Sequence, residues 1–238
     1  LYSFDVDGLD VEIGLSYHAR GIPVGEIASR VGIGWALNAG GAITRQKKGK
    51  ADDEASGYLH ENFYNTFFTS ESTRQSVYND LLADNIDLEP DRFSFNFLGL
   101  SGKFYFDQRS STKQIVMEQY SDLIIEPIFQ SGYYIISGWI ITTPDGYKYY
   151  FGLPANTSQT TRTARDSDQS QNYRAVMGSY TFLGGDLSTI YNSWQLIDIV
   201  SPTGKAVRFN YTKETTIFCR KTYDTTEDNR LGGKELVS

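Results

Sequence analysis

Histidine and cysteine are scarce in this sequence, and their scarcity excludes several kinds of site. Cys219 is the single cysteine, so an internal disulfide is impossible, and we expect its side chain to be a small buried group. His18 and His60 are the two histidines, and with Cys219 they do not offer the ligand spacing that zinc requires. No G-x-S-x-G motif accompanies either histidine, which argues against a Ser–His–Asp hydrolase.

Positive charge and long apolar runs are lacking as well. The formal net charge of −7 argues against a surface that follows nucleic-acid phosphates, so nucleic acid is not an expected partner. No apolar run is long enough to cross a membrane, so no membrane span is expected. The sequence begins in a strand-like pattern without a signal peptide, from which we expect that it is a fragment of a longer chain.

Aromatic and β-branched residues are abundant, and they determine the expected fold class. Tyr, Phe, Thr, Ile and Val favour pleated, half-buried surfaces. We therefore expect residues 1–238 to form a single all-β module, built mainly of antiparallel hairpins and sheets, as in a sandwich-like arrangement. The polar stretch at about 154–181 is expected to be an inserted loop, because it offers little apolar surface to bury.

One short helix interrupts the expected β structure, near residues 72–84. Ser72 and Gln75 fit a capping box at its start. Apolar residues then recur at helical spacing over 77–82. The spacing and the cap together predict a helix of about three turns.

Four turns carry the chemistry of hairpins. Asp7-Gly8 separates two runs of alternating apolar residues, which is a strong hairpin signal. Three later units each consist of an apolar strand, a four-residue turn that ends in glycine, and a return strand; their turns are 99–102, 143–146 and 201–204. We expect Gly102, Gly146 and Gly204 to close these turns and open the return strands.

The stretch 32–45 has the most characteristic pattern in the chain. Apolar and small residues alternate over 33–37, as in a strand with one buried face, and 38–41 has the composition of a turn. We expect a glycine-framed hairpin in which 42–45 is the return strand. Its expected structural anchors are Gly32, Gly34, Trp35, Asn38, Gly40, Gly41 and Arg45. A dinucleotide-binding loop does not fit, because the third glycine and the following helix are missing.

Carboxylates are plentiful, but their patterns do not indicate a catalytic or metal site. The acidic residues 52–54 lie in the polar stretch 46–57, which we expect to be an exposed loop. The acidic residues within 5–12 and within 166–168 do not match the calcium-binding loop pattern. We therefore predict no catalytic residue, metal site or cofactor, while a pair of glycosidase carboxylates stays open as an alternative.

Tryptophan is the other residue type with a binding use, because exposed indole rings form platforms for sugars. Trp35, Trp139 and Trp194 each lie in a strand pattern, where burial in the core is the expected role. The alternative is a carbohydrate-binding cell-surface module, in which at least one of the three rings is exposed.

Five segments, taken together, resemble one protein family. They are 15–22 (LSYHARGI), 31–45 (VGIGWALNAGGAITR), 90–97 (PDRFSFNF), 101–107 (SGKFYFD) and 201–204 (SPTG). In this order they are similar to the N-terminal region of very large RHS/YD-repeat proteins of Gram-negative bacteria. The glycine–tryptophan motif is more distantly similar to the opening of the SpvB-type domain of toxin-complex B components.

The resemblance implies properties that the composition does not. Such proteins are exported, often by the type 9 secretion system, and their tyrosine-rich hairpins wind into a hollow β-shell that can enclose a C-terminal toxin or effector. Enzymatic activity in the family sits in the variable C-terminal segment, so no catalytic residue carries over to this chain. The resemblance implies a non-enzymatic, secreted or cell-surface module that starts or plugs the shell. Its implied partners are the remainder of the same polypeptide and the outer-membrane secretion machinery.

Overall fold

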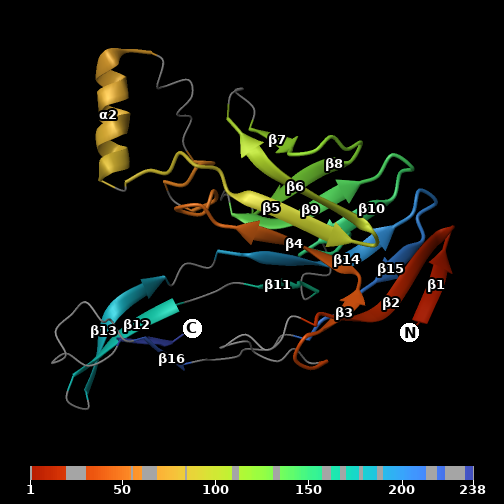
Figure 1. Ribbon diagram of the computed structural model, residues 1–238. Helices are drawn as coiled ribbons and strands as arrows, with labels where there is room; N and C mark the ends of the chain where they lie inside the picture. Colours follow the sequence, from red (N-terminus) through yellow and green to blue (C-terminus); the bar gives the residue numbers. More distant parts are fainter. Residues whose placement is uncertain are drawn as a thin grey trace.

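The computed structural model is built mostly of β-strands, with one helix (Figure 1). It describes residues 2–19, 31–54, 56–60, 69–83, 85–108, 113–130, 135–156, 162–166, 170–176, 179–186, 190–212, 219–222 and 234–237. Its elements are β1 (Tyr2–Val6), β2 (Leu9–Tyr17), β3 (Trp35–Ala39), β4 (Gly41–Gln46), α2 (Glu71–Leu82), β5 (Arg92–Phe97), β6 (Leu100–Asp107), β7 (Gln114–Met117), β8 (Ile124–Phe129), β9 (Ile136–Thr142), β10 (Lys148–Phe151), β11 (Arg165–Asp166), β12 (Ser170–Val176), β13 (Ser179–Asp186), β14 (Ser193–Val200), β15 (Ala206–Arg208), β16 (Cys219–Thr222) and β17 (Lys234–Val237). The expected all-β fold is confirmed. Over these residues, no helix combines the length and the apolar character needed to span a membrane.

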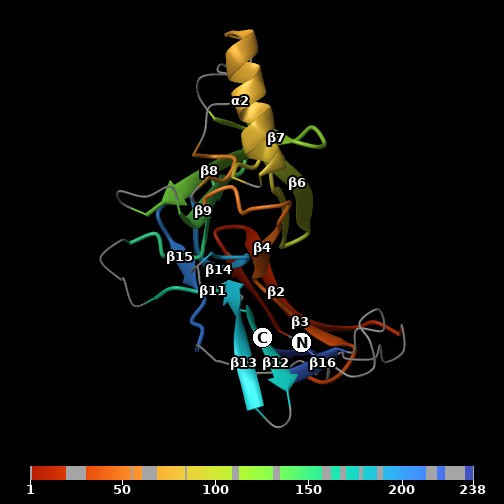
Figure 2. The ribbon, with the colours of Figure 1, turned by 90° about the vertical axis from the view of Figure 1, so that its left-hand side faces the viewer.

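The largest sheet has ten strands and curves into a nearly closed barrel (Figures 1 and 2). Its main path runs β7-β6-β5-β4-β14-β10-β9-β8, and β11 and β15 pair with parts of β14. All of these pairings are antiparallel. Strand β4 pairs with both β5 and β14, so it joins the hairpins of the first half of the chain to those of the second.

Aromatic side chains fill the interior of the barrel. Trp139 on β9 and Trp194 on β14 are fully buried and meet edge to face, with 5.7 Å between ring centroids. Phe93 on β5 contacts both rings, at 4.9 Å from Trp139 and 6.1 Å from Trp194. The other large, fully buried side chains are Phe97, Phe104, Phe106, Phe151, Ile43, Leu59, Ile136, Ile141 and Leu196. The apolar area that they remove from water stabilises the barrel.

Strands β1, β2 and β3 form a separate antiparallel sheet in that order. The predicted hairpin at Asp7-Gly8 is confirmed, because both residues have positive φ, 56° and 89°, and Val6 pairs with Leu9. The chain leaves this sheet at the end of β3 and enters the barrel as β4, with one residue between the two strands.

The predicted hairpin over 33–45 is wrong, because β3 and β4 pair with different strands. Strand β3 pairs with β2, whereas β4 pairs with β5 and β14. Asn38 therefore lies in a strand and not in a turn. Two glycines permit the change of sheet: Gly40 has a φ of 80°, and a Cβ on Gly41 would lie 2.4 Å from the Cβ of Phe97.

Two of the three repeated turns are confirmed. The Gly146 N–H donates to the Thr143 carbonyl at 2.9 Å, and the Gly204 N–H donates to the Ser201 carbonyl at 2.9 Å. Both glycines have a φ of 89°, a left-handed conformation that favours glycine. These turns connect β9 to β10 and β14 to β15.

The prediction that Gly102 closes a turn is wrong. Leu98 and Gly99, with φ of 43° and 80°, make the turn between β5 and β6, and Gly102 lies within β6. A Cβ on Gly102 would lie 2.6 Å from the Phe95 ring on the neighbouring strand. This glycine makes room for an aromatic side chain and does not shape the backbone of a turn.

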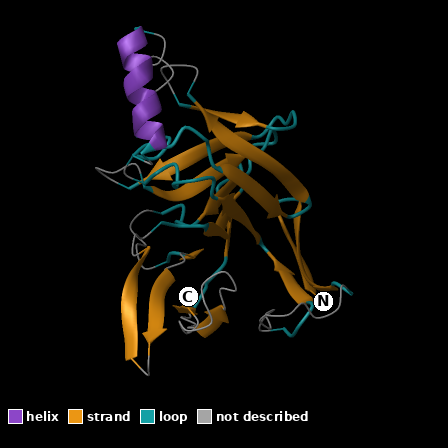
Figure 3. Cartoon of the chain, turned by 60° about the vertical axis from the view of Figure 1, so that its left-hand side comes forward, coloured by secondary structure: helices purple, strands orange, loops and turns teal. Residues whose placement is uncertain are grey.

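Helix α2 confirms the helix expected near 72–84, but its cap differs from the prediction. The N-cap is Ser70, which has an extended backbone and accepts a 3.2 Å hydrogen bond from the Thr73 N–H. Ser72 lies inside the first turn, so the predicted capping box is displaced by two residues. The helix stands away from all three sheets (Figures 1 and 3).

A third sheet has four strands in the order β13-β12-β17-β16 and lies apart from the barrel (Figure 3). Strand β12 and part of β13 fall within the stretch expected to be a loop at about 154–181, so that expectation is wrong for these residues. The two strands pair with each other as a hairpin. Backbone pairing does not require an apolar face, which is why the polar sequence did not reveal the strands.

Candidate functional site

One face of the β1-β2-β3 sheet carries apolar residues along its length. Alternate residues of β2, from Leu9 to Tyr17, lie on this face. Near the barrel the face is covered, because Val11 has no exposed surface and Leu9 and Val6 pack against the barrel core. This covered half attaches the small sheet to the barrel.

The other half of the face is exposed, and we call it the aromatic end. It consists of Tyr2, Leu15, Tyr17, Trp35 and Leu37, with exposed fractions of 65%, 41%, 57%, 43% and 55%. Tyr17 lies opposite Trp35, with ring centroids 5.1 Å apart and planes inclined at 46°. Leu15 lies opposite Leu37 beside them. The expectation that Trp35 lies on a buried face is therefore wrong at this end of the sheet.

Two of the predicted anchors, Gly32 and Gly34, shape the start of β3. The Trp35 N–H donates to the Gly32 carbonyl at 3.3 Å, and the His18 N–H donates to the Gly34 carbonyl at 2.8 Å. Both glycines have positive φ, and a Cβ on Gly34 would lie 3.0 Å from the Tyr17 ring. The glycines thus set the backbone that brings Trp35 beside Tyr17.

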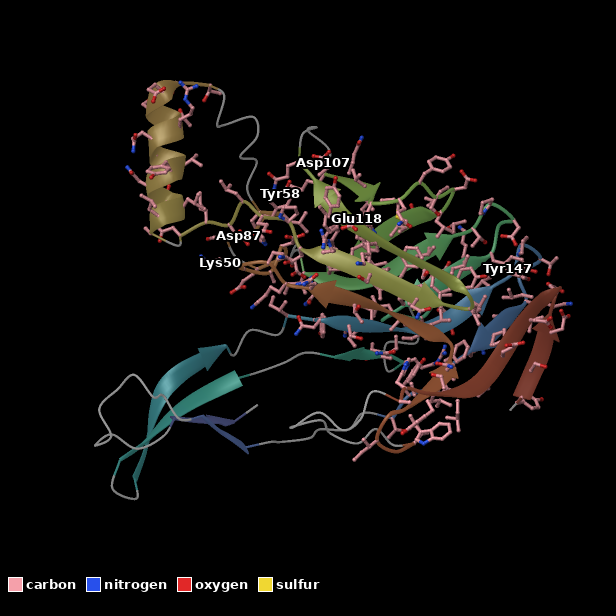
Figure 4. The ribbon with its side chains drawn as sticks, in the orientation of Figure 1. Lys50, Tyr58, Asp87, Asp107, Glu118 and Tyr147 are labelled. Atoms are coloured by element: carbon pink, nitrogen blue, oxygen red, sulfur yellow. The ribbon has the colours of Figure 1, made fainter. Side chains whose placement is uncertain are left out.

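The β1-β2 turn is fastened to the barrel by polar contacts. The Tyr147 hydroxyl donates to the Asp7 carbonyl oxygen at 2.7 Å (Figure 4). The Asp7 carboxylate accepts a 2.7 Å hydrogen bond from the Ser201 hydroxyl, and further hydrogen bonds from Thr203 and from the Lys205 ammonium. Hydrogen bonds from Lys205, Thr203 and Ser201 lower the pKa of Asp7 to about 2. The turn that Gly204 closes therefore docks the small sheet.

A second polar cluster is buried near the end of β4, around Arg45. Asp52 has no exposed surface and Asp53 is 2% exposed, so the predicted exposed loop over 46–57 is wrong at these residues. Arg45, a predicted anchor, forms an ion pair with Asp53 at 2.6 Å and a longer one with Asp91 at 3.6 Å. The acidic side chains of this loop point into the protein, where the buried Arg45 guanidinium compensates their negative charge.

Asp52 and Asp91 are joined by reciprocal hydrogen bonds. The Asp52 N–H donates to the Asp91 carboxylate at 2.9 Å, and the Asp91 N–H donates to the Asp52 carboxylate at 2.8 Å. Burial, together with the charge of Asp91, raises the pKa of Asp52 to about 8. Burial also raises the pKa of Asp91 to about 6, against the opposing effect of Arg45.

The buried cluster does not have the layout of a glycosidase pair. Glycosidase carboxylates face each other across an open cleft with room for a sugar. Here the three carboxylates of Asp52, Asp53 and Asp91 are at most 2% exposed. They accept hydrogen bonds from backbone amides, and Asp53 also pairs with Arg45. Among the residues that the structure describes, no group of three His, Cys, Asp or Glu side chains is placed to hold a metal ion. Asp168 lies outside those residues.

Of the three tryptophans weighed as a sugar platform, Trp35 alone is at the surface. Trp139 and Trp194 have no exposed area, which excludes them from a surface platform and confirms their expected place in the core. Trp35 belongs to the aromatic end. The side chain of Cys219 lies outside the described parts of the chain, so its expected burial stays a prediction.

The sequence does not reveal that Leu15, Tyr17 and Leu37 lie at the surface, nor that Asp91 belongs to a buried cluster. The alternation in β2 was visible, but alternation shows that a face is apolar and not whether it is covered. Asp91 could be found only through its contact with Asp52, which lies 39 residues earlier.

Comparison with known proteins gave no match to this chain, whether with protein-family models, with curated proteins or with solved structures. A proposal about function therefore rests on the geometry of the aromatic end and of the buried polar cluster.

Proposed function

We propose that this chain is a non-enzymatic structural module of an exported RHS/YD-type protein, and that its aromatic end docks onto further β structure of the same polypeptide. The observation that carries the proposal is the half-covered face of β2, buried at Val11 and exposed at Leu15 and Tyr17. Exposed apolar clusters of this kind mark interaction sites. Because the barrel already covers one half, another apolar sheet face is the occupant that continues the same packing.

The resemblance to RHS/YD-repeat proteins supports the same proposal. The segments that carry it, 15–22, 31–45 and 90–97, include the exposed part of β2, strands β3 and β4, and strand β5. We propose that the module starts or plugs a β-shell, that it is secreted or displayed at the cell surface, and that the outer-membrane secretion machinery exports it. A toxin or effector, where the protein has one, would be enclosed by the remainder of the shell.

The gene provides the first test. The proposal requires a coding sequence that continues with tyrosine-rich, YD-type hairpins beyond this stretch. A gene that encodes no such hairpins contradicts it.

Binding of the next segment provides the second test. That segment, expressed separately, is titrated with the wild-type chain and with a Leu15→Lys/Leu37→Lys variant in a calorimeter. We expect the variant to bind at least about 100-fold more weakly, because docking would bury two unpaired ammonium groups. The matched control is Ser3→Lys/Asn38→Lys, which adds the same charge to exposed positions on the other face of the sheet. Equal binding by all three proteins would overturn the proposed docking.

A carbohydrate-binding surface is the second candidate, favoured by the exposure of Trp35 beside Tyr17. A hollow of ≈ 350 Å³ shares Tyr2 with the aromatic end and is lined also by Ser3, Glu12, Ile13 and Gly14. Against it, two rings inclined at 46° do not make a flat platform for a sugar ring. A glycan array separates the candidates: binding that is lost in Trp35→Ala supports a sugar site, and an array without binding supports docking.

A further inference from the structure

Residues 47–54 and 56–60, which we call the plug, lie against one end of the barrel. Leu59 of the plug is fully buried in the core. The hydroxyl of Tyr58, labelled in Figure 4, accepts a 3.3 Å hydrogen bond from the backbone just after β6. The Asp53 carboxylate accepts one of 2.8 Å from the Ile136 N–H at the start of β9. The starts and ends of several barrel strands therefore meet at the plug.

Carboxylates outnumber cations where the plug meets the barrel. Asp52, Asp53 and Asp91 are all buried, and Arg45 is the cation that faces them. Arg45 lies 2.6 Å from Asp53 and 3.6 Å from Asp91, so its charge is committed mainly to Asp53. Three ionised carboxylates would leave two excess negative charges away from water, which is strongly unfavourable.

The other charged groups around the plug make contacts of their own. The Lys48 ammonium lies 3.8 Å from Glu89 in a partly exposed pair, and Arg92 pairs with Glu118. Three further titratable groups contact the backbone: Asp87 accepts from the N–H groups of Lys50 and Glu89, Glu54 accepts from the N–H of Ala51, and His60 lies 3.3 Å from the carbonyl of Asp53. The charged groups that act on Asp52 are Asp91, Arg45 and Asp53, and Arg45 is paired with Asp53, so the excess negative charge falls on Asp52 and Asp91.

One oxygen of this pair is placed to carry a proton. Both oxygens of Asp91 accept backbone hydrogen bonds, from Lys48 and Asp52, and Oδ1 of Asp52 accepts one from Asp91. Oδ2 of Asp52 is buried and has no hydrogen-bond partner among the described residues. Protonation at this oxygen removes a buried charge and leaves every hydrogen bond of the pair in place.

We propose that Asp52 holds a proton at neutral pH and that the plug is a pH-sensitive catch, which loosens from the barrel when this proton is lost to solvent as the pH rises. Loss of the proton puts a second carboxylate charge beside Asp91, and the contact between the plug and the segment before β5 becomes repulsive. Asp53 keeps its ion pair with Arg45 in both states, so the plug stays tethered to β4 and β9 while the Asp52–Asp91 contact opens.

The direction of the pH effect follows from the raised pKa values. Asp52 has a pKa of about 8 in the folded chain, against about 4 for an ordinary aspartate. The folded state therefore binds the proton more tightly, and the stability that the proton provides is present below about pH 4 and lost as the pH rises towards 8. Over that interval the ratio of folded to unfolded chains falls by up to about tenfold per pH unit for this one proton.

The test is the urea midpoint between pH 5 and pH 9, measured for the wild type and for Asp52→Asn, which imitates the protonated acid. Both proteins carry Cys219→Ser, because a thiol titrates near pH 8.5 and would obscure the effect. We expect the wild-type midpoint to fall up to about pH 8 and then level off, and the Asp52→Asn midpoint to show a clearly smaller fall. The control Asp87→Asn removes a carboxylate outside the plug that accepts hydrogen bonds from the N–H groups of Lys50 and Glu89, and it should keep the wild-type slope.

A second measurement locates the change. Hydrogen exchange of the Asp52 and Asp91 amides, corrected for the intrinsic effect of pH, should accelerate between pH 6 and 9 relative to the amide of Ile141 in the barrel. Equal slopes for wild type and Asp52→Asn, or unchanged relative exchange, would overturn the proposal. If Asp52→Asn fails to fold, Asp91→Asn replaces it, because removing either charge of the pair should reduce the slope.

Discussion

Arg45 and Asp53 form an ion pair with 2.6 Å between Nη1 and Oδ1, and neither side chain has any exposed surface. The guanidinium also lies 5.3 Å from the ring centroid of Phe93 and 5.2 Å from that of Trp194. The pair thus connects the plug to the aromatic core of the barrel. Removing one partner would leave the other charge buried without compensation.

Asp53→Ala should therefore lower the free energy of unfolding by about 3–5 kcal/mol, the range typical of a broken buried pair. Urea denaturation at pH 7 measures the change. The control is Glu71→Ala, which removes a partner of the exposed Glu71–Arg74 pair and should cost less than about 1 kcal/mol. Equal losses for the two variants would show that Asp53 is not buried as described.

Gly41→Ala should destabilise the chain by about 2 kcal/mol or more, because the new methyl group would lie 2.4 Å from Phe97 and the backbone there has a φ of 152°. Gly14→Ala is the matched control, since a Cβ at Gly14 meets no atom within 4 Å. The control should be neutral or slightly stabilising, by up to about 1 kcal/mol. Thermal melts of the two variants give the comparison, and a harmless Gly41→Ala would contradict the direct passage from β3 to β4.

Asp7 should give the chain a distinct acid sensitivity. Hydrogen bonds from Lys205, Thr203 and Ser201 lower its pKa in the folded chain to about 2. The stability that Asp7 provides is therefore present above about pH 4 and lost as the pH falls through 2. Asp7→Asn should lower the melting temperature at pH 7 and reduce its further fall between pH 4 and pH 2. A neighbouring exposed aspartate, changed in Asp10→Asn, should leave the profile unchanged.

Acrylamide quenching of fluorescence should find one accessible tryptophan and two protected ones. Trp35 is 43% exposed, whereas Trp139 and Trp194 have no exposed surface. Trp35→Phe should therefore remove nearly all of the quenchable emission, and the same change at Trp139 should leave it in place. Strong quenching in a well-folded Trp35→Phe variant would place a second ring at the surface and contradict the aromatic core.

The two core tryptophans should differ in their response to Trp→Phe. The indole N–H of Trp194 donates to the Ile136 carbonyl at 3.1 Å, whereas that of Trp139 has no partner among the described residues. Trp194→Phe loses a hydrogen bond and leaves a buried carbonyl oxygen, but Trp139→Phe removes an unsatisfied donor. Urea denaturation should show Trp194→Phe to be the more destabilising by about 1 kcal/mol. A larger loss in Trp139→Phe would reverse this assignment.

Local sequence was sufficient to predict the hairpins in which two consecutive strands pair across a short turn. Asp7-Gly8, 143–146 and 201–204 set their own backbone angles, so their hairpins could be predicted. The glycines at 40–41 have similar chemistry, yet they lead into another sheet, because β4 finds its partners in β5 and β14. Nothing within a few residues of Gly40 carries that information.

The prediction of an exposed loop over 46–57 was wrong because contacts with other parts of the chain, and not local polarity, decide which residues are buried. The acidic residues at 52–53 resemble a solvated loop in the sequence, but Arg45 and the Asp91 amide satisfy them inside the protein. The opposite error was made at Trp35, which was expected to be buried but is exposed, because an apolar strand face is buried only where another element covers it. Both outcomes depend on contacts between distant parts of the chain.

The direct passage from β3 through Gly40 into β4 has a mechanical consequence. A pull on the small sheet along β3 would reach the barrel through the backbone itself, with no slack loop to extend first. Strand β4 is hydrogen-bonded on both sides, to β5 and β14, so such a pull would load both rows of bonds in shear. Bonds loaded in shear share the force and break together, whereas bonds that are peeled break one at a time. The small sheet is therefore joined to the barrel by a connection that resists extension, and tension applied to the small sheet would pass directly to β4.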